Sequence, residues 1–292
     1  MSLISGFEKI VRCDEPLAPH TWFQLGGPAQ YFAEPNSVDE LAALVRRCRE
    51  QEFAVRLLGG GSNILVRDDG VRGVVIRLAA PAFTEIVAKG QTVSAGGGAK
   101  LGLVISTAVR EGLAGLEALV GIPGTLGGAL HGNAGSRGGD IGQWTCQATV
   151  MTRTGELLQR SREELVFAYR QSSLDELVIL NAQVQLEQED PEELTKRMQK
   201  QWIVKKASQP LGHQSAGCIF RNPRGMSAGM LIEQAGLKGT RVGQAEVSDR
   251  HANFIVTGEG AKSTEVLALI EAVRSRVAER LGVDLETEIE IW

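Results

Sequence analysis

The stretch LLGGGSNILV (residues 57–66) places three consecutive glycines and a Ser-Asn pair between two short apolar runs. Ordering this run is costly, because glycine loses more backbone freedom on folding than any other residue. Bare backbone is favoured where another group approaches closely, and neighbouring peptide N–H groups can converge on an anion. The stretch therefore predicts a tight turn between two strands that either packs closely or holds a phosphate.

Two familiar glycine motifs do not fit this turn. No lysine follows, as the pattern G-x-x-x-x-G-K-[ST] requires, and residues 64–66 are strand-like, whereas G-x-G-x-x-G opens a helix. A second glycine-rich run, GIPGTLGGALHGNAGSRGGD (residues 121–140), has too much glycine for a regular element and offers further amides. Two such turns would suit the two phosphates of a dinucleotide without help from a helix dipole. Tight turns without a ligand are the open alternative.

The bulk composition is that of a globular protein with two or three domains. The chain has 292 residues, of which 43% are hydrophobic and 23% charged. A net charge of −4 without a basic block argues against nucleic-acid binding. No segment approaches the roughly 20 apolar residues of a membrane span, and no signal-peptide core is present, so we expect a cytoplasmic protein. The four cysteines and four histidines lack metal-site spacing, and we expect neither a metal nor a disulfide.

Local patterns predict an alternation of strands and helices. In the first third, a capping box at Ser37 and Glu40 starts a helix, and strands follow at 53–58, 64–66 and 71–78. The middle third predicts hairpins at 84–95 and 148–158, a helix at 101–111 ending at Gly112, a strand at 177–186, and a helix capped by Asp190. Beyond a polar segment at 205–215 we expect strands at 218–221 and 253–257, a helix from Ser227 to Gly236, and an amphipathic helix through residues 266–281.

Seven short motifs occur in one order along the chain: GGGSN, GIPGTLGGA with NAG, FAYRQSS, SAGCIFRNP, GLKG, HANFIV and LETEI. As an ordered set, from about residue 20 to 291, they resemble the UDP-N-acetylenolpyruvoylglucosamine reductase family in its compact form, which lacks an extra substrate-capping loop. The resemblance implies an α+β protein with a two-lobed FAD-binding region of the vanillyl-alcohol-oxidase type and a C-terminal α+β substrate-binding domain. The implied domains are residues 1–83, 84–207 and 208–292.

The resemblance also implies the cofactor and the reaction. NADPH would reduce a non-covalently bound FAD, and flavin N5 would then pass a hydride to the vinyl carbon of UDP-N-acetylglucosamine enolpyruvate. The product would be UDP-N-acetylmuramate, a peptidoglycan precursor. The FAD diphosphate would lie against both glycine turns, at Gly59, Gly60, Gly61, Ser62, Asn63, Gly121, Ile122, Pro123, Gly124, Thr125 and Gly128.

Three residues match the family's catalytic positions. Arg170 would bind the substrate carboxylate and stabilise the enolate-like intermediate; without the resemblance it reads as a surface arginine after a short helix. Cys218 stands where the family usually has a serine proton donor, and a thiol, with an ordinary pKa of about 8.5, is a stronger acid than a hydroxyl. Its alternative role is a small buried hydrophobe. Glu288 is the last Glu of the L-E-x-E motif, although period two alone indicates a solvent-facing residue.

The remaining assignments concern binding and competing functions. Tyr169, Asn222 and Lys238 match substrate-contacting positions, while His131 and His251 read as structural residues. The expected partners are the UDP-sugar and NADPH, with no nucleic acid and no membrane, and we expect a monomer. An FAD-dependent oxidase of the same fold and a non-catalytic sugar-nucleotide or flavin sensor are the alternative functions.

Overall fold

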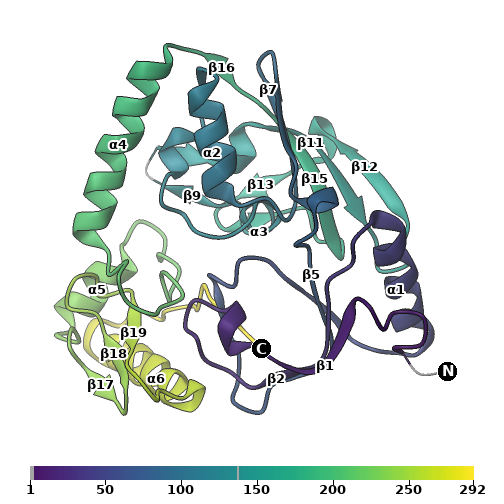
Figure 1. Cartoon of the computed structure of the whole chain (residues 1–292). Helices are drawn as coiled ribbons and strands as arrows, with labels where there is room; N and C mark the ends of the chain where they lie inside the picture. Colours follow the sequence, from purple (N-terminus) through teal and green to yellow (C-terminus); the bar gives the residue numbers. More distant parts are fainter. Residues whose placement is uncertain (1–2, 137) are drawn as a thin grey trace. The chain divides into compact units, whose positions relative to one another are not determined.

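The computed structural model describes residues 3–136 and 138–292 (Figure 1). The chain forms two compact units, and each unit is assembled from three separate segments. Unit 1 comprises Met1–Cys13, Tyr31–Gly60 and Arg72–Val204. Unit 2 comprises Asp14–Gln30, Gly61–Val71 and Lys205–Trp292.

A four-stranded sheet and helix α1 (Val38–Glu50) form the first layer pair. The strand order is β1 (Val11–Pro16), β2 (Pro28–Ala33), β5 (Val71–Arg77) and β3 (Val55–Leu58), and β3 runs parallel to β5. Only one of the two hydrogen bonds of the predicted capping box forms. Ser37 accepts a hydrogen bond from the Glu40 N–H at 3.2 Å, but the Glu40 carboxylate accepts from the Asn36 N–H instead. The apolar side chains of α1 are buried in one cluster with those of β5.

The second sheet of unit 1 is antiparallel and has five strands. Its order is β12 (Leu157–Ser161), β11 (Thr145–Met151), β15 (Val178–Gln185), β7 (Thr92–Gly96) and β6 (Ile86–Lys89). Both predicted hairpins are confirmed. Helices α2 (Leu101–Arg110) and α3 (Leu126–His131) pack on this sheet, as Figure 1 shows, and share one apolar cluster with its strands. Strand β15 is buried along most of its length, because residues 178 and 180 belong to the cluster of α1 and residues 179, 182 and 184 to that of α2 and α3.

The expectation that residues 121–140 lack regular structure is wrong. Thr125 caps α3, and its hydroxyl accepts a hydrogen bond from the Gly128 N–H at 3.4 Å. Leu126, Ala129 and Leu130 are buried, so tertiary packing outweighs the low helix propensity of the two glycines. The second glycine turn therefore does lead into a helix, contrary to the sequence-based expectation.

Unit 2 combines the C-terminal segment with two segments from the N-terminal part of the chain. It holds α5 (Ala228–Gln234), α6 (Ser263–Leu281), and a sheet of β17 (Arg241–Val242), β18 (Ala245–Val247) and β19 (Ile255–Thr257). Strand β20 (Glu290–Ile291) pairs in parallel with β4 (Ile64–Leu65). The predicted inner face of α6 is buried through Val277, whereas Leu281 is exposed. The predicted strand at 218–221 is wrong as a regular element, because only isolated bridges form there.

The remaining elements complete the described chain. They are β8 (Leu113–Ala114), β9 (Gly135–Ser136), β10 (Gly139–Asp140), β13 (Phe167–Ala168), β14 (Gln171–Ser172), β16 (Glu187–Gln188) and helix α4 (Pro191–Ser208), with 3-10 turns at Ala18–His20, Pro81–Phe83, Glu117–Leu119, Ile141–Gln143 and Arg162–Glu164. As predicted, the Asp190 carboxylate caps α4 by accepting from the Glu192 and Glu193 N–H groups. Among the described helices, none has the length and apolarity needed to cross a bilayer.

Candidate functional site

Two glycine turns of unit 1 touch each other backbone to backbone. A Cβ atom added to Gly60 would lie 2.6 Å from Gly124 Cα, and one added to Gly59 would lie 2.8 Å from Thr125 Oγ1. Real Cβ atoms do not approach other heavy atoms so closely, so a side chain here would force the turns apart. The glycines of residues 59–60 are therefore explained first by the close approach of the other turn.

The junction also presents unused hydrogen-bond donors. Within the described chain, no hydrogen bond is donated by the N–H groups of Gly59, Gly60, Gly124 and Thr125. The Ile122 N–H, in contrast, donates to the Leu119 carbonyl, and the Gly128 N–H donates to the Thr125 hydroxyl. Unpaired peptide N–H groups at neighbouring turns are the feature of an anion-binding site. The junction therefore fits a diphosphate group.

A third glycine tract, which the sequence reading did not single out, supports the second turn. The Gly127 N–H donates to the Gly97 carbonyl, and the Leu126 N–H donates to that of Ala99, both at 2.8 Å. A Cβ at Gly97 or Gly98 would overlap the backbone carbonyl of Ile179 or Leu78. These bonds fix where α3 begins and thus where the Gly124–Thr125 peptide lies.

The remainder of the GGGSN turn belongs to unit 2. Gly61 has a φ of 64°, and a Cβ there would overlap the His20 carbonyl, so only glycine fits. The Asn63 side-chain amide donates to the Glu288 carbonyl at 3.1 Å, and the Glu290 N–H donates to the Asn63 carbonyl at 2.9 Å. Asn63, predicted to contact the cofactor, thus holds the backbone of the segment that carries Glu288.

Arg170 lies at the tip of a tight hairpin. Strands β13 and β14 pair antiparallel with Ala168 opposite Gln171, so Tyr169 and Arg170 form the two-residue turn. Arg170 has a left-handed φ of 56°, a conformation that costs a non-glycine residue about 1 kcal/mol or more and that clusters at functional sites. One guanidinium nitrogen, Nη1, donates to the Gly135 carbonyl at 3.2 Å, and the guanidinium carbon lies 5.4 Å from the centre of the exposed Tyr169 ring.

Cys218 lies on a segment that is held from both sides within unit 2. Cys218 forms an isolated bridge with Phe254, and the Asn253 side chain donates to the Phe220 carbonyl at 2.8 Å and accepts from the Phe220 N–H at 2.9 Å. On the other side, the Glu288 N–H donates to the Ile219 carbonyl at 2.7 Å. The structure thus brings Cys218 and Glu288 onto adjacent backbone segments. Cys218 is partly exposed, unlike the fully buried Cys48.

Asn222 and Lys238 are both engaged in the fold. The Asn222 side-chain oxygen accepts from the Ala228 N–H, at the start of α5, at 2.9 Å. Lys238 Nζ forms an ion pair with Glu233 at 2.7 Å, and both side chains are partly exposed. A ligand anion that binds Lys238 therefore has to compete with the Glu233 carboxylate.

His131 and His251, which were expected to be structural residues, both contact the backbone of the fold. The His131 ring nitrogen Nδ1 lies 3.1 Å from the Leu174 carbonyl. The His251 Nδ1 accepts from the Asn253 N–H, and its ring packs at 4.8 Å against that of Phe254. Burial lowers the pKa of His251, which favours the neutral ring that this acceptor role requires.

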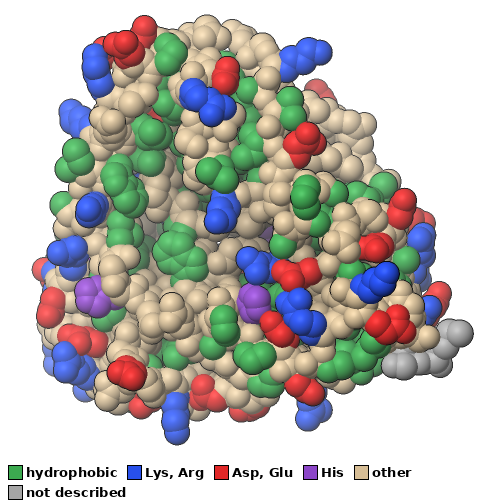
Figure 2. All heavy atoms as spheres, viewed as in Figure 1, with side chains coloured by type: hydrophobic (Ala, Val, Ile, Leu, Met, Phe, Trp, Pro, Cys, Tyr) green, Lys and Arg blue, Asp and Glu red, His purple; other side chains and the backbone are tan. Residues whose placement is uncertain are grey.

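Basic and acidic side chains are interspersed on the molecular face drawn in Figure 2. This distribution accords with the small net charge of −4. The local charges that matter for an anionic ligand are consequently the individual groups described above rather than a broad basic field.

Comparisons with known proteins identify relatives of both parts of the chain. Residues 29–161 match the FAD binding domain family, and residues 209–292 match the C-terminal domain of UDP-N-acetylenolpyruvoylglucosamine reductase. The UDP-N-acetylenolpyruvoylglucosamine reductase 2 of Symbiobacterium thermophilum is 44% identical over 97% of this chain and 92% of its own length. The Bacillus subtilis reductase is 39% identical over 96% and 93%, respectively.

Solved structures agree with these sequence relatives. The crystal structure of the reductase from Thermus caldophilus superposes with a TM-score of 0.80 at 38% identity, covering 97% of this chain and 98% of that one. Berberine bridge enzyme from Eschscholzia californica is 17% identical, with a TM-score of 0.50 over 65% of this chain and 44% of its own, and shows the fold alone. The predicted α+β fold is confirmed, with an FAD-binding region of the vanillyl-alcohol-oxidase type and the C-terminal domain of the reductase family.

Proposed function

Because the chain belongs to the UDP-N-acetylenolpyruvoylglucosamine reductase family, we propose that it reduces UDP-N-acetylglucosamine enolpyruvate to UDP-N-acetylmuramate for peptidoglycan synthesis, with NADPH as reductant. The observation that carries the proposal is the junction of two glycine turns with unused N–H groups, within the segment that matches an FAD binding domain. The expected cytoplasmic location and monomeric state stay predictions.

The proposed cofactor is a non-covalently bound FAD. The N–H groups of Gly59, Gly60, Gly124 and Thr125 would donate to its diphosphate, and their neutral peptide dipoles need no counter-ion. FAD, when bound, supplies the hydride that it takes from NADPH. The protein's own contribution is to hold the substrate and to manage the charge and proton that accompany the hydride.

Arg170 is the proposed binding group for the substrate carboxylate. Hydride addition to a vinyl carbon leaves negative charge on the adjacent carbon and its carboxylate. A guanidinium stays charged at any working pH and presents a planar fork that fits a carboxylate. Its place at the tip of a two-residue turn, with Tyr169 beside it, supports a role in ligand binding over that of an ordinary surface arginine.

Cys218 is the proposed proton donor. Its Sγ–H bond breaks as a C–H bond forms at the carbon next to the carboxylate, and the remaining thiolate regains a proton from water. Glu288, on the neighbouring segment, is the proposed second catalytic group, and it must be protonated or hydrogen-bonded because a bare carboxylate would repel the developing charge. Tyr169, Asn222 and Lys238 are proposed to bind the substrate, with Lys238 suited to a phosphate once it leaves Glu233.

An anaerobic titration tests the function. NADPH is expected to bleach the flavin spectrum of the purified protein, and the enolpyruvyl sugar is expected to restore it. Rapid return of colour in air with indifference to the sugar would indicate an oxidase, and sugar binding without NADPH consumption would indicate a sensor. Either result overturns the proposal.

Two substitutions test the proton donor. Cys218→Ala is expected to retain flavin reduction by NADPH and to lose flavin reoxidation by the enolpyruvyl sugar. Cys218→Ser is expected to retain both steps. Cys146→Ala is the matched control, because Cys146 is equally a partly exposed cysteine but lies on β11 in unit 1. Full turnover in Cys218→Ala would remove Cys218 from the mechanism, and the same outcome in Glu288→Gln would remove Glu288.

A further inference from the structure

A short segment, residues 131–135, is hydrogen-bonded to both strands of the hairpin that carries Arg170. The Ser172 hydroxyl donates to the His131 carbonyl at 2.9 Å, and the His131 ring lies against the Leu174 carbonyl. At the other end of the segment, the Gly135 carbonyl accepts from Arg170 Nη1. Between these contacts lies Asn133, to which no function has been assigned above.

Asn133 uses both ends of its side-chain amide. Its Nδ2 donates to the Ala168 carbonyl at 2.8 Å, and its Oδ1 accepts from the Gly142 N–H at 3.0 Å. The side chain is only 3% exposed, and the backbone has a left-handed φ of 42°, which Asn tolerates better than most residues. Ala168 is the last residue before the Tyr169–Arg170 turn. Asn133 thus fixes the peptide from which the turn departs.

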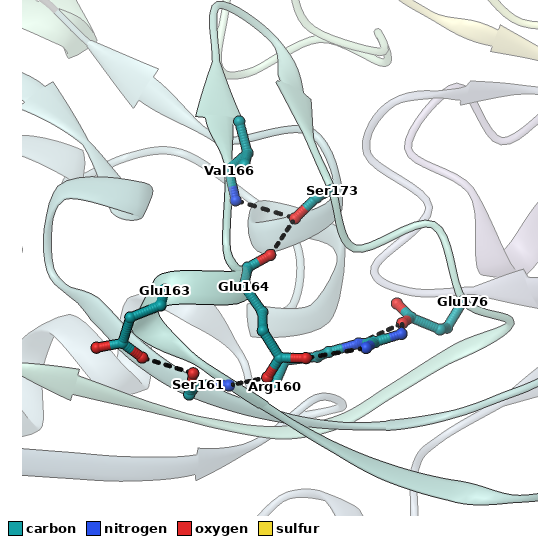
Figure 3. Close-up of polar contacts among 7 residues, drawn as sticks. All are labelled: Arg160, Ser161, Glu163, Glu164, Val166, Ser173 and Glu176. Atoms are coloured by element: carbon teal, nitrogen blue, oxygen red, sulfur yellow. Dashed lines mark hydrogen bonds and ion pairs between the residues drawn. The ribbon is translucent and has the colours of Figure 1, made fainter.

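The base of the same hairpin is fixed by a different network (Figure 3). The Ser173 hydroxyl accepts from the Val166 N–H at 3.0 Å and donates to the Glu164 carbonyl at 3.3 Å. Below it, the Arg160 guanidinium binds the nearly buried Glu176 carboxylate at 2.6 Å. Because this network holds only the base, the tip needs a separate anchor if the guanidinium is to keep one position.

From these contacts we infer that Asn133 is a positioning residue for Arg170, acting through the Ala168 carbonyl without touching the substrate. The inference rests on the proposed function, in which Arg170 binds the substrate carboxylate. Misplacing a charged group by about 1 Å can lower a rate by up to about 100-fold, so a strained two-residue turn benefits from a rigid support. The bond to Gly142 adds rigidity, because a Cβ at Gly142 would overlap the ring of Phe167 on β13.

The test uses Asn133→Asp in the FAD-loaded full-length protein. Asp keeps the left-handed backbone and an acceptor for the Gly142 N–H, but it cannot donate to the Ala168 carbonyl. Asn133→Gly is the second variant, because it removes the side chain without burying a charge. Ser263→Ala is the matched control: the Ser263 hydroxyl is also buried and bonds a backbone group, the Asp68 N–H at 2.9 Å, but both residues belong to unit 2.

Three measurements decide the inference. Hydrogen exchange of residues 166–173 is expected to speed up in both Asn133 variants and to stay unchanged in Ser263→Ala. Reoxidation by the enolpyruvyl sugar is expected to slow by about 10- to 100-fold, while flavin reduction by NADPH stays within about twofold of wild type. In the Arg170→Ala background, Asn133→Asp is expected to cause almost no further loss, because two residues that act as a unit are not additive.

The outcomes separate the two proposals. Unchanged exchange in the hairpin, or a full additional loss in the Arg170→Ala background, would refute the positioning role even in an active enzyme. A wild-type protein that reduces no enolpyruvyl sugar would overturn the proposed function instead. In that case the exchange measurement still decides whether Asn133 holds the hairpin tip.

Discussion

Gly60→Ala tests directly the close contact between the two glycine turns. The new Cβ would lie 2.6 Å from Gly124 Cα and 3.2 Å from its carbonyl carbon, whereas ordinary contacts begin at 3.4 Å. The neighbouring atoms belong to backbone, so no side chain can rotate away. Because Gly60 is not among the glycines with positive φ, the strain is steric alone. The two turns must therefore move apart by roughly 1 Å, the order of displacement that overpacked sites require.

The magnitude follows from what the two turns are proposed to hold. Overpacking costs about 1–3 kcal/mol of unfolding free energy. A hydrogen bond to a charged group contributes about 1.5–3 kcal/mol, so losing one N–H···phosphate bond weakens FAD binding by about 10- to 100-fold. We therefore expect Gly60→Ala to lower both the melting temperature and the affinity for FAD.

The assay is a titration of the apoprotein with FAD, together with thermal melting with and without the cofactor. Gly102→Ala is the matched control, because Gly102 lies on the exposed face of α2 and a Cβ there meets nothing within 4 Å. Alanine in a helix should stabilise this control by up to about 1 kcal/mol. If Gly60→Ala melts early but binds FAD with wild-type affinity, close packing alone explains the glycines and the phosphate site is refuted.

Three further predictions concern stability. Burial raises the pKa of the Cys48 thiol to about 11, above its ordinary value of about 8.5. The unfolding free energy should therefore fall as the pH rises from about 9 to 11, by up to about 3 kcal/mol. Urea titrations should show that Cys48→Ala abolishes this loss. Burial lowers the pKa of His251, so the unfolded chain takes up a proton before the folded protein does as the pH falls below 6.5. The unfolding free energy should therefore decline below this pH. His251→Gln should make that decline less steep. Arg197→Met leaves the buried Glu117 carboxylate without its ion-pair partner and should cost about 1–3 kcal/mol; an unchanged denaturation midpoint would contradict the pairing.

Elements whose signals are local could be predicted from the sequence. The Ser37 and Asp190 caps lie within three residues of the N–H groups that they accept from. Gly112 and Gly155 have φ values of 70° and 78°, as a helix end and a hairpin turn require. In each case the residue that specifies the structure and the group it satisfies are close in the chain.

The features that sequence reading missed depend on distant partners. Helix α3 forms in a glycine-rich run because residues 97–99 accept hydrogen bonds from its first turn. Asn133 and Asn253 each donate to a backbone carbonyl more than 30 residues away, and no local sequence pattern indicates that partner. One weak signal was available: each of these asparagines stands two residues after a histidine, His131 or His251.

Cys218 replaces the serine that the family usually has, while the segment around it is held by backbone contacts. The contacts that hold this segment join backbone atoms of residues 218–220 to Phe254, to Glu288 and to the Asn253 side chain. A serine is compatible with these backbone contacts. We therefore expect Cys218→Ser to keep the segment in place, with a melting temperature close to that of the wild type, while it changes the acidity of the donor. A kinetic difference between the two proteins then reports proton transfer rather than folding, which makes this position the most direct probe of the proposed mechanism.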